Sequence, residues 1–98
     1  MLSKSVKIAP VNDTDFMRLD KLENAHFYGC EPGDVLVLFY AERTIWEGKE
    51  AFNSVCSEYF AVNDMANAEA AFEKRLKADN PCRPAVGQSV EKVLGKAA

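Results

Sequence analysis

The sequence predicts a small α+β domain, in which a short two- or three-stranded antiparallel sheet is packed by three to four helices. The run from Val35 to Tyr40 is rich in β-branched and aromatic residues, which is typical of a buried strand. Two later segments, 49–61 and 65–76, carry apolar residues at helical spacing. With 98 residues, 48% of them hydrophobic, the chain can bury one core, so we expect a single domain over 1–98. The alternative is an all-α bundle.

The first element expected is a short edge strand over 3–9, where polar and apolar residues roughly alternate before Pro10. A helix is then expected over about 13–28. Its start signal is the clearest in the chain, because Asn12 is a favoured N-cap residue and two aspartates follow it in the first turn. Gly29 is placed to end this helix.

The segment from residue 32 to residue 47 has two interpretations. In the first, Val35–Tyr40 is a central strand that turns at 41–43 into a second strand, Thr44–Trp46. In the second, Pro32 opens a helix over 32–47, because several apolar side chains also fit one helical face. We favour the hairpin, and periodicity over so short a run leaves both open.

The second half of the sequence predicts helices. One is expected over 49–61, and another carries the apolar residues from Met65 to Leu76 and ends before Asn80-Pro81. The segment 81–98 contains two prolines and a glycine before a short apolar pattern. It is expected to dock loosely on the domain and to form a short helix over about 88–95.

Composition narrows the classes of function. The formal net charge is -3, from 15 acidic and 12 basic residues, so the chain lacks the basic excess of a nucleic-acid coat and the dense acidity of a DNA mimic. The longest apolar run, Val35 to Ala41, is too short to span a bilayer. Three cysteines without paired spacing, and no signal-peptide pattern, predict a cytoplasmic protein with reduced thiols and no membrane partner.

The sequence offers few groups for catalysis. His26 is the only histidine, and no serine or cysteine has a spacing that ties it to that imidazole. Cys56 lies on the apolar face of its expected helix and is interpreted as a small core residue, whereas Cys30 and Cys82 lie in turn-like segments. We therefore expect no enzyme, no catalytic residue, no metal site and no cofactor.

Residues 5–27 run from Ser5 through Pro10 to Phe27 and combine an expected strand, a helix cap and an expected helix. This strand–cap–helix pattern resembles the opening of the GNAT acetyltransferases. The glycine-rich pyrophosphate loop of that family has no counterpart in this sequence, and the chain is too short for that fold. No family is assigned.

The positive functional argument comes from the aromatic residues. Tyrosine and tryptophan are enriched at the centres of protein interfaces, and adjacent aromatic pairs cannot all point into the core. The sequence therefore predicts a non-catalytic binding protein that inhibits or adapts another protein by occupying a surface, as small proteins of phages and mobile elements often do; a homo-oligomer is a further option. The expected interaction surface comprises Tyr28, Tyr40, Trp46, Tyr59 and Phe60.

One basic concentration supports an alternative function. Four basic residues lie between positions 74 and 83 and would contact phosphates of a nucleic acid: Lys74, Arg75, Lys77 and Arg83. Cations in the last turn of a helix also complement the helix dipole without any ligand. Nucleic acid is therefore the less favoured partner.

Overall fold

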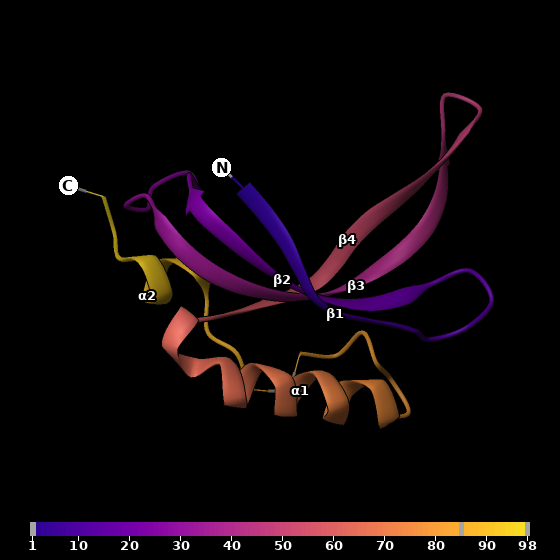
Figure 1. The fold of residues 1–98 in the computed structure, drawn as a ribbon. Helices are drawn as coiled ribbons and strands as arrows, with labels where there is room; N and C mark the ends of the chain where they lie inside the picture. Colours follow the sequence, from indigo (N-terminus) through magenta and orange to yellow (C-terminus); the bar gives the residue numbers. More distant parts are fainter. Residues whose placement is uncertain (1, 85, 98) are drawn as a thin grey trace.

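The computed structural model describes residues 2–84 and 86–97, and Figure 1 shows their arrangement. Four strands form one antiparallel sheet in sequence order, followed by the helical part of the chain. The strands are β1 (Leu2–Pro10), β2 (Phe16–Ala25), β3 (Gly33–Trp46) and β4 (Lys49–Phe60). A 3₁₀ turn η1 (Val62–Asp64) leads into the main helix α1 (Met65–Lys77), and a short helix α2 (Val90–Leu94) follows near the end. The α+β class is confirmed, but with one main helix instead of three to four.

The helix expected over 13–28 is wrong, because this segment forms a loop and then strand β2. The local cap signal was nevertheless real. The Oδ1 atom of Asn12 accepts hydrogen bonds from the backbone N–H groups of Thr14 and Asp15, both at 2.9 Å. An N-cap side chain makes the same kind of bond, and so does an Asx-turn inside a loop. The strand–helix pattern that resembled the GNAT opening is therefore also absent.

The expected helix over 49–61 is wrong as well, since these residues form β4. A β-bulge explains the helix-like spacing. Glu58 pairs with Leu38, but Val55 pairs with Tyr40, so Cys56 and Ser57 both face Phe39. The extra residue of the bulge shifts the alternation of apolar side chains along β4. Apolar residues on the two sides of the bulge therefore recur every three to four positions, as they would in a helix. Cys56 itself has a φ of 56°, in the left-handed region.

The segment with two interpretations, 32–47, contains one strand of 14 residues, β3, which continues through 41–43 without turning. The turn lies later, at Glu47 and Gly48, whose φ angles of 50° and 75° are those of a tight hairpin. Both the expected turn at 41–43 and the alternative helix over 32–47 are therefore wrong, although the strand assigned to Val35–Tyr40 is confirmed.

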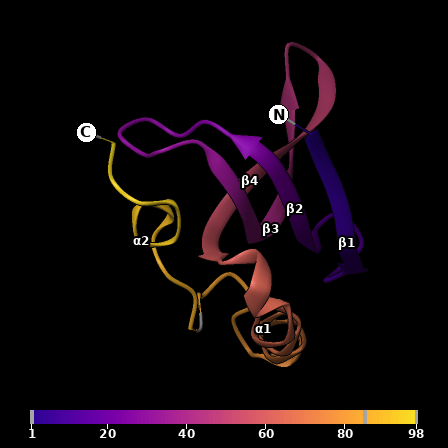
Figure 2. The same cartoon turned by 60° about the vertical axis from the view of Figure 1, so that its left-hand side comes forward.

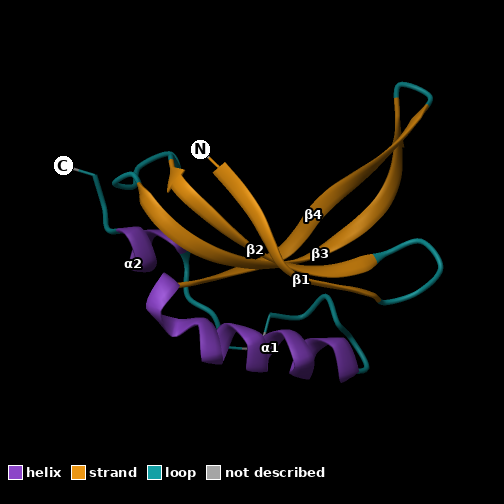
Figure 3. Cartoon of the chain, in the orientation of Figure 1, coloured by secondary structure: helices purple, strands orange, loops and turns teal. Residues whose placement is uncertain are grey.

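The core lies between the sheet and α1. It is formed by Met17, Leu19, Leu36, Leu38, Phe60, Ala68, Ala71 and Phe72. Alternation along each strand places Asp20, Val37 and Tyr59 on the opposite face, which we call the distal face. The ends of the strands bend away from α1, so the distal face is the inner side of the bend (Figures 1 and 3).

The segment after α1 returns along the sheet, and Figure 2 shows α2 beside the strands and away from α1. Gln88 pairs with Tyr59 of β4 through two backbone hydrogen bonds of 2.9 and 3.1 Å. A disulfide joins Cys82 to Cys56 across 26 positions of sequence. The expectation of reduced thiols, with Cys56 as a small core residue, is therefore wrong for Cys56 and Cys82. Cys30 is a free thiol.

Candidate protein-interaction site

The β3–β4 hairpin extends beyond the rest of the sheet. The pairing between β2 and β3 ends at Phe16 and Ala41, whereas β3 and β4 continue to pair as far as Trp46 and Lys49. Residues 42–53 therefore form a two-stranded arm, which projects from the body of the domain in Figure 1. A two-stranded hairpin by itself is marginally stable in water, so this arm depends on its root for support.

The arm exposes large apolar side chains. Trp46 is 69% exposed, Ile45 61% and Phe52 44%. Ile45 and Trp46 are neighbours in one strand, so they point to opposite faces of the arm. Phe52 lies at the edge of the arm near the body, where its ring contacts Phe16 of β2 at a centroid distance of 4.9 Å. A set of exposed apolar side chains close together on one element is typical of an interaction surface.

Asp15 holds the root of the arm. Its carboxylate accepts the Tyr40 hydroxyl at 2.7 Å and the backbone N–H of Arg43 at 3.0 Å. These bonds stabilise the ionised form and lower the pKa of Asp15 to about 2, the Arg43 N–H having the largest effect and the Tyr40 hydroxyl the next. The same hydrogen bond raises the pKa of Tyr40, because ionisation would remove the proton that the phenol donates to Asp15; desolvation and the charge of Asp15 add to this shift. The loop between β1 and β2 therefore fixes the direction in which the arm leaves the sheet.

The five aromatic residues expected on one surface lie in different places. Trp46 is on the arm and Tyr40 at its root. Tyr28 is exposed in the turn between β2 and β3, and Tyr59 is half-buried against Phe27 on the distal face. Phe60 is part of the core, so it offers no surface. Sequence reasoning missed Ile45 and Phe52; the Glu47-Gly48 pair between two β-rich runs was the signal that could have placed the hairpin turn there.

Arg75 occupies a structural position within the basic cluster. Its guanidinium donates to the carbonyl oxygens of Pro81 and Cys56 at 3.0 Å each, and more distantly to those of Cys82 and Leu38. Its side chain is buried and pairs with the buried carboxylate of Glu58. Burial lowers the pKa of Arg75 and the charge of Glu58 opposes this shift. Arg75 thus fastens α1 to two strands and to the tail.

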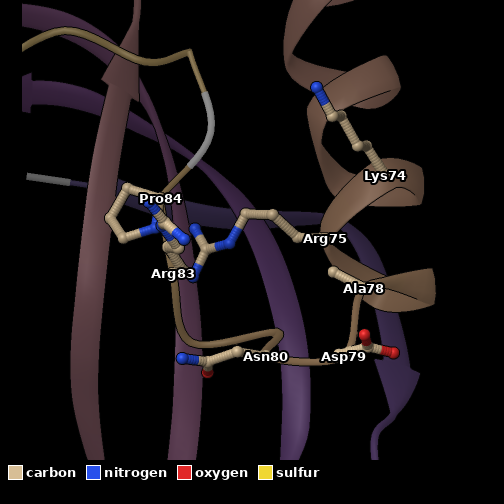
Figure 4. A pocket seen from close by; sticks show the side chains of 7 residues that line it. All are labelled: Lys74, Arg75, Ala78, Asp79, Asn80, Arg83 and Pro84. Atoms are coloured by element: carbon tan, nitrogen blue, oxygen red, sulfur yellow. The ribbon is translucent and has the colours of Figure 1, made fainter.

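Two of the remaining basic residues, Lys74 and Arg83, lie around a cleft at the end of α1, which we call the helix-end cleft (Figure 4). It has a volume of about 470 Å³, and Lys74, Arg75 and Arg83 contribute to its lining together with Ala78, Asp79, Asn80 and Pro84. Lys77 is exposed on α1 and is not among the lining residues. The structure therefore brings three of the four expected cations together, but the donors of Arg75 are already engaged with carbonyl groups.

The groups that could support catalysis are dispersed. His26 is exposed after β2, and Cys30 lies in an isolated bridge with Lys96. Neither residue lines the helix-end cleft. Among residues 2–84 and 86–97, no group of three or more histidine, cysteine, aspartate or glutamate side chains is placed to hold a metal ion.

The fold and the arm define the chain as a small α+β domain with a projecting apolar hairpin. No protein-family model matches it, and neither a curated protein nor a solved structure gives a match. Within its described residues, neither helix has the length and apolar character needed to cross a bilayer.

Proposed function

We propose that this chain is a small non-catalytic binding protein that modulates another protein by occupying one of its surfaces. The observation that carries the proposal is the arm, which exposes Ile45 and Trp46 near the tip of the hairpin and Phe52 near its base. Desolvating this much apolar surface favours association, and tryptophan is among the residues that most often dominate binding energy.

The partner that suits the arm is a folded protein with an apolar pocket into which the hairpin can insert. A hairpin that carries apolar side chains on both faces can insert into a pocket, whereas a flat partner would contact only one face. The charges of the arm are mixed, with Arg43 paired to Glu50 at 3.3 Å. They therefore favour neither a strongly acidic nor a strongly basic partner.

The test is capture of a partner by tagged protein from nuclease-treated lysate of the source cells, with three versions of the chain compared. The expected result is one protein retained by the wild type and by Tyr28→Ala, and lost with Trp46→Ala. Tyr28→Ala is the matched control because it removes an exposed aromatic ring distant from the arm in sequence and strand position. Equal retention by all three versions would show that the arm is not the binding surface.

Self-association is examined by sedimentation at several concentrations. If the wild type forms a dimer that dissociates in Trp46→Ala, the arm binds a second copy of this chain. That result would contradict the proposal that it binds a different protein. The alternative function, nucleic-acid binding through Lys74, Lys77 and Arg83, predicts binding that falls steeply with salt. Retention of DNA or RNA without any protein, unaffected by Trp46→Ala, would favour that alternative.

A further inference from the structure

A small depression lies on the distal face, apart from the arm. Strand register places Asp20, Val37 and Tyr59 side by side in one row across β2, β3 and β4. Val37 is short and lies between the other two, so it forms the floor of a depression of about 250 Å³. The rest of the lining comes from Leu22, Phe27, Phe39, Ser54 and Ser57.

Three of the residues that line the depression are aromatic, namely Phe27, Phe39 and Tyr59. Tyr59 and Phe27 meet edge to face, with ring centroids 5.6 Å apart and planes at 80°. Phe39 lies one row further along β3, beyond Val37 on the same face. The faces of such rings carry partial negative charge and attract cations, most of all cations that shed water easily.

Asp20 adds a formal negative charge to the depression. Only 5% of this residue is exposed. Its Oδ1 accepts a hydrogen bond from Nε of Arg18 at 2.6 Å, while its Oδ2 lies 3.5 Å from the Ser3 hydroxyl, at the long limit for such a bond. A carboxylate has about four acceptor positions, so Asp20 retains capacity to interact with a second cation after binding Arg18.

We propose that this depression is a binding site for a small organic cation of the quaternary ammonium class. Aromatic walls combined with a carboxylate suit a bulky, weakly hydrated cation better than a neutral or anionic molecule. The volume is below the roughly 300–1,000 Å³ of pockets for drug-sized ligands, which limits the ligand to one small group. This inference is independent of the proposed function of the arm.

The test compares choline with 3,3-dimethylbutan-1-ol, its neutral counterpart of equal shape, by amide chemical-shift titration. Choline is expected to shift the amides of Asp20, Val37 and Tyr59 and to bind about three- to thirtyfold more tightly than the alcohol, as the magnitude of cation–π attraction implies. Equal affinity of the two probes, or no shift in this row with either, would overturn the proposal.

Variants separate the charge from the shape of the site. Arg18→Gln removes the cation that competes for Asp20, so choline affinity is expected to rise severalfold while that of the alcohol stays constant. Tyr59→Leu keeps the wall apolar but removes a ring, and should weaken choline about three- to tenfold. Tyr28→Leu, a change in an exposed turn, is the control and should alter neither. The direct variant, Asp20→Asn, changes a buried residue and can fail to fold. Arg18→Gln avoids this difficulty, and an unchanged choline affinity in that variant would contradict the proposal that the charge of Asp20 attracts choline.

Discussion

The Nη1 atom of Arg75 lies 3.6 Å from the Oε2 atom of Glu58, and each side chain exposes only 1% of its surface. The two residues come from α1 and β4, so the pair joins the helix to the sheet inside the protein. Burying an ion pair costs free energy of desolvation. Removing only one of the two partners costs more, because the other charge is then buried without compensation. The stability of this domain therefore depends on a polar contact as well as on its apolar core.

Arg75→Met is expected to lower the free energy of unfolding by about 3–5 kcal/mol, because the carboxylate of Glu58 would lose its buried cation. Glu58→Gln should cost less, since Arg75 would keep its bonds to the carbonyl groups of Pro81 and Cys56. Urea denaturation of the two variants measures the difference. An equal cost for both would show that the carbonyl bonds contribute little.

Loss of the disulfide should destabilise the protein without changing its fold. The bond closes a loop with a sequence separation of 26, for which chain entropy predicts about 3.5 kcal/mol of stabilisation. The double variant Cys56→Ala, Cys82→Ala should unfold at correspondingly lower urea concentration, and Cys30→Ala serves as the matched control. Alkylation of the unfolded, unreduced protein should label one cysteine; labelling of three would contradict the disulfide.

Acidification should release the root of the arm. The pKa of Asp15 is about 2 in the folded protein, against about 3.9 in an unfolded chain, so its contribution to stability is complete above pH 4. The contribution falls as the pH drops from about 4 to about 2, because the unfolded chain then binds the proton more readily than the folded one. Carboxyl carbon chemical shifts followed against pH give the pKa directly.

Tyr40→Phe checks the cause of this shift. It removes the donor at 2.7 Å and should raise the pKa of Asp15, although the Arg43 N–H keeps it below the usual value. A pKa of Asp15 that is the same with and without the Tyr40 hydroxyl would show that this bond does not hold the root.

Gly87 is expected to be intolerant of a side chain. A Cβ atom at this position would lie 2.5 Å from the Cβ of Glu58, which belongs to the sheet and has little room to move. Gly87→Ala should cost about 1–3 kcal/mol and displace the tail from β4. Faster hydrogen exchange at the amides of Gln88 and Tyr59 measures that displacement.

The matched control is Gly33→Ala, whose Cβ would meet only the end of the Leu94 side chain, at 3.1 Å. Its effect on exchange at Gln88 and Tyr59 should be small. Unchanged exchange in Gly87→Ala would mean that the tail approaches the sheet less closely at this point.

The elements that could be predicted are those in which the local sequence pattern matches the burial of the side chains. The strand at Val35–Tyr40 was predicted because it is apolar on both faces, with buried side chains pointing alternately to α1 and to the distal face. The helix α1 was predicted because its apolar residues recur at helical spacing, namely Met65, Ala68, Ala71, Phe72 and Leu76. The edge strand before Pro10 was also predicted, with a bulge that the sequence did not reveal.

The candidate site was less predictable than the fold. Trp46 was singled out as a contact residue, but its position on a projecting arm depends on where β2 stops pairing with β3. Phe60 and Arg75 were expected at a surface and are buried, because the first belongs to a strand and the second points inward from α1. Aromatic character and charge say nothing about the direction of a side chain until the element type is known.

The sequence by itself determined the α+β class, the main helix and the central strand. Tertiary structure decided that 16–25 and 49–60 are strands, that Cys56 meets Cys82, and that Arg75 meets Glu58. The physical reason is that strand pairing and these contacts join residues far apart in the chain. Asn12 illustrates it: its local hydrogen bonds suit a helix or a hairpin loop equally, and the hydrogen bonds between β2 and its neighbouring strands select the loop.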